Sequence, residues 1–314
     1  MNKLLKTTLA GLLLATPVIH AQIELSDNLS VTGFLDMSAV DVNSETGEDS
    51  SSFNLDQAEI DFLIDFDEIT AQIDLNYLGN NSTEEFDLEQ AFITYNLGDG
   101  ANIEAGKFNS YHGWETVEPT GLYQYSYAYD LAPNSIPLFH NGVRFNYGDD
   151  FVNLGLSVVD SVYGPDGSIG DSEYGAEAKI VIFPADGLTV YLGFAKDKGA
   201  DAIEDKDLIN FWTSYEIGNM TYALEFNDYD MGANITGSQW LLMANMGITD
   251  NFGITARVSE DQQDWAGGDT ATKFTVSPGW SVNDNLGMLV ELSQTDLGTE
   301  GTNTTIAFET IFTF

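Results

Sequence analysis

The chain has 314 residues, with 50 Asp and Glu against 10 Lys and Arg, a formal net charge of −40 and no cysteine. This acid excess excludes nucleic acid and anionic lipid headgroups as partners, because both are bound through clusters of lysine and arginine. The lack of cysteine excludes disulfides and thiolate chemistry.

The first 21 residues have the features of a cleavable export signal. Lys3 and Lys6 precede an apolar stretch over 8–19, and Ala21 is a small residue suited to cleavage. The apolar stretch is about a dozen residues long, which is too short to cross a membrane as a helix. We therefore predict a signal peptide over 1–21 and a single domain over 22–314.

Sixteen segments of the mature chain alternate apolar and polar residues. In order they are 29–39, 54–66, 69–79, 87–97, 101–109, 140–148, 151–160, 174–184, 188–196, 207–217, 219–228, 238–248, 251–260, 270–282, 285–295 and 302–314. In the second segment, for example, Ile60 and Phe62 share one face while Glu59 and Asp61 share the other. This period of two predicts β-strands with one apolar and one polar side.

Short and long connections alternate strictly between these segments. The short ones are Gly, Asn and Asp turns, such as Gly98-Asp99-Gly100, which suit tight hairpins. The long ones lie near 40–53, 80–86, 110–139, 161–173, 197–206, 229–237, 261–269 and 296–301. Together with the aromatic Phe314 at the end of the last segment, this pattern is typical of outer-membrane barrels. We predict an all-β, antiparallel, up-and-down transmembrane barrel of 16 strands, with short periplasmic turns and long extracellular loops.

A soluble antiparallel sandwich would alternate in the same way. Its inner residues would form a dry core, however, and most predicted strands carry a charge on their polar face. A barrel of eight strands is filled by its own side chains, whereas one of roughly 16 to 18 strands leaves an aqueous channel. The strand count therefore predicts a pore.

Motifs over 106–145 resemble the OmpL-like β-barrel porins of Gram-negative bacteria. They are Gly106-Lys107-Phe108, Gly113-Trp114-Glu115, Pro137 and Gly142-Val143-Arg144-Phe145. The resemblance implies passive diffusion of small hydrophilic solutes across an outer membrane of lipid and lipopolysaccharide, without a cofactor. It implies recognition of the last strand, ending at Phe314, by the barrel-assembly machinery. As in classical porins, it implies association into a homotrimer and a third loop, 110–139, folded into the lumen.

Alternation directs a set of charged residues toward the lumen. The bases are Arg144, Lys179, Arg257 and Lys273, the wall acids are Glu59, Asp61, Asp74, Glu104, Glu225 and Glu291, and the third loop adds Glu115, Glu118 and Asp130. Loop acids that face wall bases would create a transverse field at a constriction, and rings of carboxylates favour cations. We predict a cation preference; the alternative is that these are solvated charges with no tuned role. Lys107 is a misfit, because alternation puts it on the lipid face unless a bulge or snorkelling intervenes.

The third loop also carries alternating tyrosines, namely Tyr123, Tyr125, Tyr127 and Tyr129. On one side of an extended segment they would stack on sugar rings, which suggests a channel for sugars or other small nutrients. The alternative is that they pin the loop to the barrel wall. A non-conducting structural or adhesive surface barrel is a further alternative.

Other chemistry is sparse, and we predict no catalytic residue, no enzyme and no metal site. His112 with Glu115 or Ser110 lacks the third orienting group that a triad needs. The stretch 41–47 faintly resembles a calcium loop, but Gly47 comes one place late and Ser52 stands where the twelfth ligand belongs, so it does not fit the EF-hand pattern. The sequence leaves open whether the acidic loops bind divalent cations nonspecifically. Such binding would link these loops to lipopolysaccharide.

Overall fold

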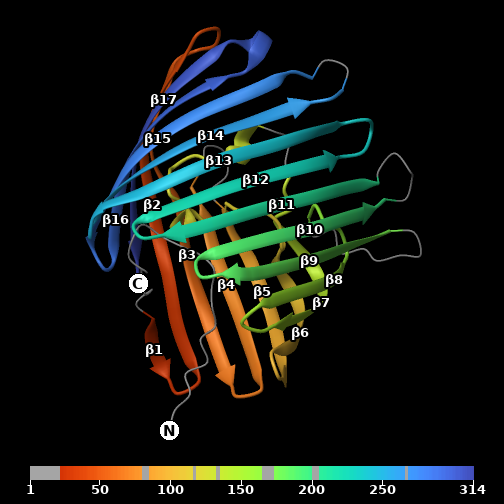
Figure 1. Ribbon diagram of the computed structural model, residues 1–314. Helices are drawn as coiled ribbons and strands as arrows, with labels where there is room; N and C mark the ends of the chain where they lie inside the picture. The colour runs from red at the N-terminus through yellow and green to blue at the C-terminus, as the bar shows by residue number, and fades with distance from the viewer. Residues whose placement is uncertain are drawn as a thin grey trace.

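The computed structural model describes residues 22–79, 85–115, 118–131, 135–164, 173–199, 205–265 and 268–314. Sixteen antiparallel strands curve into a closed barrel (Figure 1), which confirms the predicted fold. Within the described ranges, no helix is long and apolar enough to cross a membrane. The predicted signal peptide, 1–21, lies outside the described residues.

Each barrel strand pairs with its sequence neighbour, and β17 pairs with β2 to close the ring. The strands are β2 (Leu29–Ser44), β3 (Ser50–Phe66), β4 (Ile69–Leu78), β5 (Glu85–Gly98), β6 (Ala101–Asn109), β7 (Phe139–Gly148), β8 (Val152–Val159), β9 (Tyr174–Ala185), β10 (Leu188–Lys198), β11 (Lys206–Ile217), β12 (Met220–Asp230), β13 (Thr236–Thr249), β14 (Phe252–Gln263), β15 (Thr270–Asn283), β16 (Leu286–Asp296) and β17 (Thr302–Thr313). Closure gives each of the sixteen barrel strands a partner on both sides, which a lipid environment requires.

The structure differs from the predicted strands at two places. The β2–β3 ladder continues to the Val42–Ser50 pair, so the predicted loop over 40–53 shrinks to 45–49. The added residues are mostly polar, and they extend the hairpin beyond the part of the sequence with a clear apolar face. The second difference is a short strand, β1 (Ile23–Ser26), which pairs with β2 beyond the end of β17.

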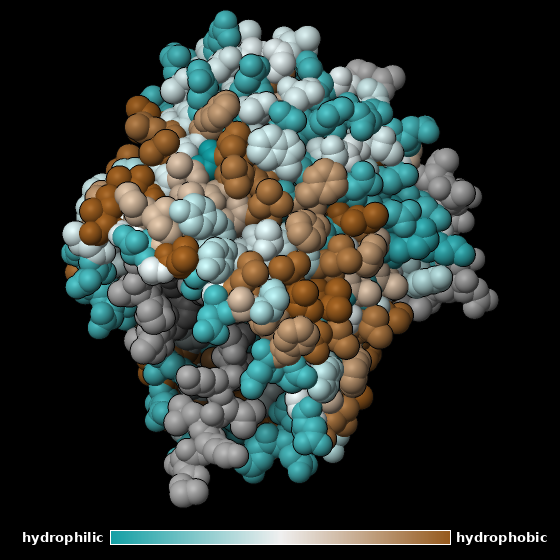
Figure 2. All heavy atoms as spheres, in the orientation of Figure 1, coloured by the Kyte–Doolittle hydropathy of each residue, from teal (hydrophilic) through white to brown (hydrophobic). Residues whose placement is uncertain are grey.

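The two faces of the wall have opposite chemistry. Along β14, Thr255, Arg257 and Ser259 are buried inside the barrel, whereas the intervening Ala256 is exposed. Large exposed apolar residues such as Ile93 and Phe274 lie on the outer face. Figure 2 shows apolar residues gathered across the middle of the visible wall, with hydrophilic residues toward both ends. An apolar outer band between polar rims is the surface that a bilayer-spanning barrel needs.

The barrel is closed at a tightly packed seam. The backbone amides of Gly33 and Phe314 each donate to the carbonyl of the other at 3.0 Å. A Cβ atom at Gly33 would lie 2.2 Å from the Glu59 carbonyl oxygen and 2.8 Å from the Phe314 ring. The glycine therefore allows the last residue to lie against β2.

We expect Gly33→Ala to lower the unfolding temperature of the detergent-solubilised barrel, because overpacking costs about 1–3 kcal/mol. Gly287→Ala is the matched control, since a Cβ there meets nothing within 4 Å. The measurement is the temperature at which the compact band on an SDS gel converts to the unfolded one. Equal transition temperatures for the two variants would contradict this account of the seam.

Candidate functional site

The chain between β6 and β7 crosses the interior of the barrel. We call residues 110–115, 118–131 and 135–138 the lumenal segment; its regular structure is limited to two 3-10 helices, η1 (Pro119–Gly121) and η2 (Ala128–Leu131). It reaches well-separated walls: the Gly113 amide donates to Asn210 of β11 at 3.1 Å, and the Tyr125 hydroxyl lies 3.3 Å from Ser38 Oγ of β2. Figure 1 shows this segment inside the ring of strands, as predicted.

A buried cluster around Arg257 holds the middle of the lumenal segment. The guanidinium contacts Glu115 and donates to the Ser126 carbonyl at 2.7 Å and to Ser126 Oγ at 3.0 Å. Glu115 also accepts from the Ala128 amide at 2.6 Å, and Ser126 donates through its amide and hydroxyl to Glu291 at 2.9 and 2.7 Å. Arg257 is 3% and Glu291 0% exposed. Losing one partner of such a buried pair typically costs about 3–5 kcal/mol.

The other three wall bases also lie against acids or aromatic rings. Lys273 Nζ is 2.7 Å from Asp130 of the segment. Arg144 forms an ion pair with Glu104 and its guanidinium carbon is 4.3 Å from the Phe108 ring centre. Lys179 Nζ is 4.4 Å from the centre of the Tyr111 ring. Of the acids expected to face wall bases, the structure thus brings Glu115 and Asp130 to them.

Glu118 of the lumenal segment lies beside acidic side chains of the barrel wall. One carboxylate oxygen each of Glu59, Glu89 and Glu118 lies within 4.8 Å of the others. Burial, and after it the nearby carboxylates of Asp61, Glu89 and Asp74, raises the pKa of Glu118 to about 8. Glu89 was missed by sequence reasoning, although the adjacent polar pair Glu89-Gln90 interrupts the alternation of its strand.

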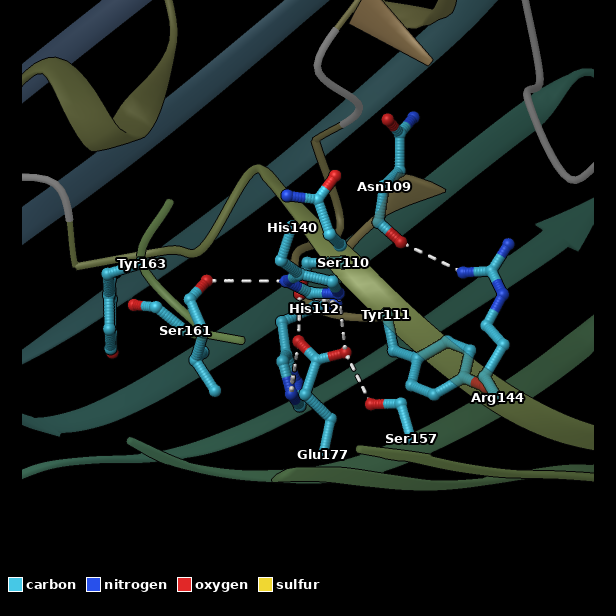
Figure 3. Close-up of polar contacts among 12 residues, drawn as sticks. Asn109, Ser110, Tyr111, His112, His140, Arg144, Ser157, Ser161, Tyr163 and Glu177 are labelled. Carbon is cyan, nitrogen blue, oxygen red and sulfur yellow. Dashed lines mark hydrogen bonds and ion pairs between the residues drawn. The ribbon is translucent and has the colours of Figure 1, made fainter. Parts of the chain in front are cut away.

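Both described histidines meet one carboxylate where the segment begins (Figure 3). Glu177 of β9 accepts from Ser110 Oγ at 2.5 Å and from Ser157 Oγ at 3.1 Å. Its oxygens lie 3.2 Å from His140 Nε2 and 3.7 Å from His112 Nε2, with all three side chains fully buried. Burial lowers the pKa of His112, and the Glu177 carboxylate partly opposes this shift. Because Ser110 donates to Glu177, the cluster lacks the serine–histidine contact of a triad, and it anchors the segment instead.

The tyrosines do not form one continuous track. Tyr123 packs with Ala223, Leu241 and Met243 on the β12–β13 wall, whereas Tyr125 reaches Ser38 on β2. The extended register is also broken by η2, which begins at Ala128. The side chain of Tyr129 lies outside the described residues, and Tyr127 is half-buried. These contacts correspond to the alternative in which tyrosines pin the loop to the wall.

Lys107 lies near the end of β6 and beside the outer end of β5. Its ammonium contacts the Leu88 carbonyl oxygen and lies 3.9 Å from Asp87, and its side chain is 17% exposed. An outward lysine that reaches polar groups at a rim is snorkelling, which is one of the two explanations offered by the sequence.

A cavity adjoins the lumenal segment. It lies between Leu122 of the segment and the inner faces of β16 and β17, where Leu289 and Glu309 line it. It reaches the short β15–β16 turn at Asp284.

Comparison with known proteins agrees with this geometry. The family model described as "Putative beta-barrel porin-2, OmpL-like" matches residues 28–314. No curated protein sequence matches the chain. Among solved structures, an anion-selective porin from Comamonas acidovorans superposes with a TM-score of 0.71 at 13% identity, covering 91% of this chain and 99% of that one. The outer-membrane channel DcaP of Acinetobacter baumannii gives 0.70 at 12% identity, covering 91% and 97%, and Salmonella typhi OmpF gives 0.69 at 13%, covering 93% and 100%.

We expect Arg257→Gln to free the lumenal segment, because the loss leaves the Glu115 carboxylate buried without its guanidinium. The measurement is limited chymotrypsin digestion of the folded barrel in detergent, with cleavage sites mapped by mass spectrometry. Lys196→Gln is the control, since Lys196 pairs with Asp207 on the exposed surface. Full protection of residues 110–131 in the Arg257 variant would show that the cluster does not hold the segment.

Proposed function

The chain belongs to the OmpL-like β-barrel porins, and we propose that it forms a water-filled channel that prefers cations and passes small hydrophilic solutes by diffusion across the bacterial outer membrane. The observation that carries the cation preference is the unequal balance of charge on the inner wall. The four wall bases Arg144, Lys179, Arg257 and Lys273 each lie against an acid or an aromatic ring. Buried inward acids, by contrast, are numerous: Asp36, Glu59, Asp74, Glu89, Glu104, Glu177, Glu225, Glu291 and Glu309.

Electrostatics supports this sign of selectivity. Arg144, Arg257 and Lys273 are each paired with a carboxylate and contribute little net field to a passing ion. The more numerous remaining acids outweigh the single charge of Lys179 and determine the potential of the lumen. Carboxylates that line a pore attract cations and repel anions. The Comamonas porin is anion-selective, but at 13% identity its likeness to this chain is one of fold alone. We therefore infer selectivity from the lining residues of this chain.

The test replaces two inner acids at the side of the barrel where the cavity lies: Glu309 lines the cavity, and Asp36 lies opposite Ile311, another lining residue. Asp36 and Glu309 are buried on the neighbouring strands β2 and β17. We expect the double variant Asp36→Asn, Glu309→Gln to lower the potassium-to-chloride permeability ratio at least about twofold, because each charge roughly 8 Å from an ion in water contributes about 0.5 kcal/mol. The measurement is the reversal potential of single channels under a potassium chloride gradient.

Asp250→Asn is the matched control for that experiment, since Asp250 is an exposed acid in the short β13–β14 turn. Its permeability ratio should stay at the wild-type value. A ratio in the double variant equal to that of the control would overturn the role proposed for the inner acids.

We propose a channel and not an enzyme, because Ser110 and both histidines are engaged with Glu177 at the anchor of the segment. An alanine variant of His112 that abolished a hydrolase activity of the purified barrel would contradict this. Among the side chains that the structure describes, no contact of Tyr123, Tyr125 or Tyr127 favours a sugar-specific channel over a general one.

Export and assembly complete the proposal. The basic start and apolar stretch of 1–21 support cleavage after Ala21, and the paired position of Phe314 at the seam supports its role as a signal for the barrel-assembly machinery. The apolar outer band supports contact with outer-membrane lipid and lipopolysaccharide. A homotrimer stays a prediction, which chemical cross-linking in native outer membranes would test.

A further inference from the structure

Carboxylates from two strands of the barrel wall converge on the lumenal segment. Glu59 of β3 and Glu89 of β5 are 1% and 5% exposed, and each presents an oxygen within 4.8 Å of the others and of an oxygen of Glu118. Asp61 and Asp74, which are paired directly across β3 and β4, lie beside them. Carboxylates at this spacing destabilise one another unless protons or a cation offset their charge.

A buried amide oxygen is an independent sign of a ligand at this place. Asn76 of β4 is 4% exposed, lies opposite Glu59 in the ladder and donates through Nδ2 to Glu89, so its amide lies beside two of the three carboxylates. Its Oδ1 atom has no hydrogen-bond partner among the described residues. Leaving a buried acceptor unsatisfied costs about 1–3 kcal/mol, and a bound cation would satisfy it.

A β-bulge in β5 turns one of these carboxylates, that of Glu89, toward the lumen. Asp74 pairs with Gln90 and the next residue, Leu75, pairs with Leu88, so Glu89 is the extra residue of a β-bulge. Strict alternation from Leu88 would turn either Glu89 or Gln90 toward lipid, yet both are buried inside. Bulges commonly redirect a side chain in this way beside functional sites.

We propose that Glu59, Glu89, Glu118 and Asn76 bind a calcium ion that ties the lumenal segment to the β3–β5 wall. The donors are all oxygen atoms, which suits hard cations and disfavours transition metals. Calcium accepts roughly six to eight oxygens in flexible geometry, whereas magnesium demands a near-ideal octahedron. An irregular set drawn from three strands and a loop therefore favours calcium. The site requires only the folded barrel and does not depend on the proposed conduction.

The test is equilibrium dialysis of radioactive calcium against the refolded barrel in a zwitterionic detergent, in about 0.1 M potassium chloride to screen the general negative charge. We expect one saturable site per chain, weakened at least about tenfold by Glu89→Gln, which is equivalent to about 1.4 kcal/mol. Asn76→Ala should weaken it as well, although this variant keeps every carboxylate. Glu225→Gln removes a buried inward acid on β12 and should leave the affinity unchanged.

Weak, unsaturable binding by the wild type would overturn the proposal, as would equal affinities in Glu89→Gln and Glu225→Gln. Each variant is first shown to be folded by its compact band on an SDS gel, so a misfolded protein is not counted. Single-channel recording of the same preparation distinguishes a failure of the calcium-site proposal from a failure of the channel proposal. A conducting barrel without calcium binding contradicts the cation site alone, and a calcium-binding barrel that never conducts contradicts the channel alone.

Discussion

The contact between Arg257 and Glu115 is the interaction on which the interior of this barrel depends. The lumenal segment has only two 3-10 helices of its own, so tertiary contacts must fix its course. Arg257 supplies donors to a carboxylate, a carbonyl and a hydroxyl of the segment, and Glu291 accepts the remaining donors of Ser126. The attraction within a buried ion pair offsets the desolvation of its charges only when further hydrogen bonds form, and Ser126 supplies two of these to Arg257. These polar contacts therefore determine where the lumenal segment lies, and with it how much of the lumen stays open.

The same alternating strands present an apolar face to lipid on the outside and a polar face to the lumen on the inside. Outside, apolar residues meet lipid and the closed ladder satisfies the backbone. Inside, the same strands present acids, serines and asparagines that bind the lumenal segment or border its cavity. The large acid excess of the chain is compatible with this fold because many of the acids are buried on the inner face, while the outer face carries large exposed apolar residues. The charge is directed to the lumen and to the rims.

The parts of the structure that were predicted from sequence are those set by local chemistry. Period-two alternation and Gly, Asn and Asp turns located all sixteen barrel strands, because each signal lies within about ten residues. β1 was missed because four residues carry too little pattern, and Glu89 was missed because a bulge breaks the period. The partners of Glu115, Asp130 and Glu118 could not be predicted, since they depend on how a loop folds against strands far away in the sequence. The spacing of 142 residues between Glu115 and Arg257 shows how distant such partners are.

The Glu177 cluster illustrates the same limit for function. Sequence reasoning considered His112 as a catalytic group with Ser110 or Glu115, but Glu115 is bound by Arg257, and Ser110 is bound by Glu177. Ser110 and His112 instead contact one buried carboxylate of β9, an arrangement that depends on three-dimensional contacts and could not be read from the sequence.

The most direct test of the account is planar-bilayer recording of the purified, refolded wild-type protein with potassium chloride at unequal concentrations on the two sides. The account predicts stable conductance steps and a reversal potential whose sign corresponds to potassium passing more readily than chloride. A reversal potential of the opposite sign would contradict the role given to the inner acids. The absence of conductance from a correctly folded barrel would contradict the channel itself.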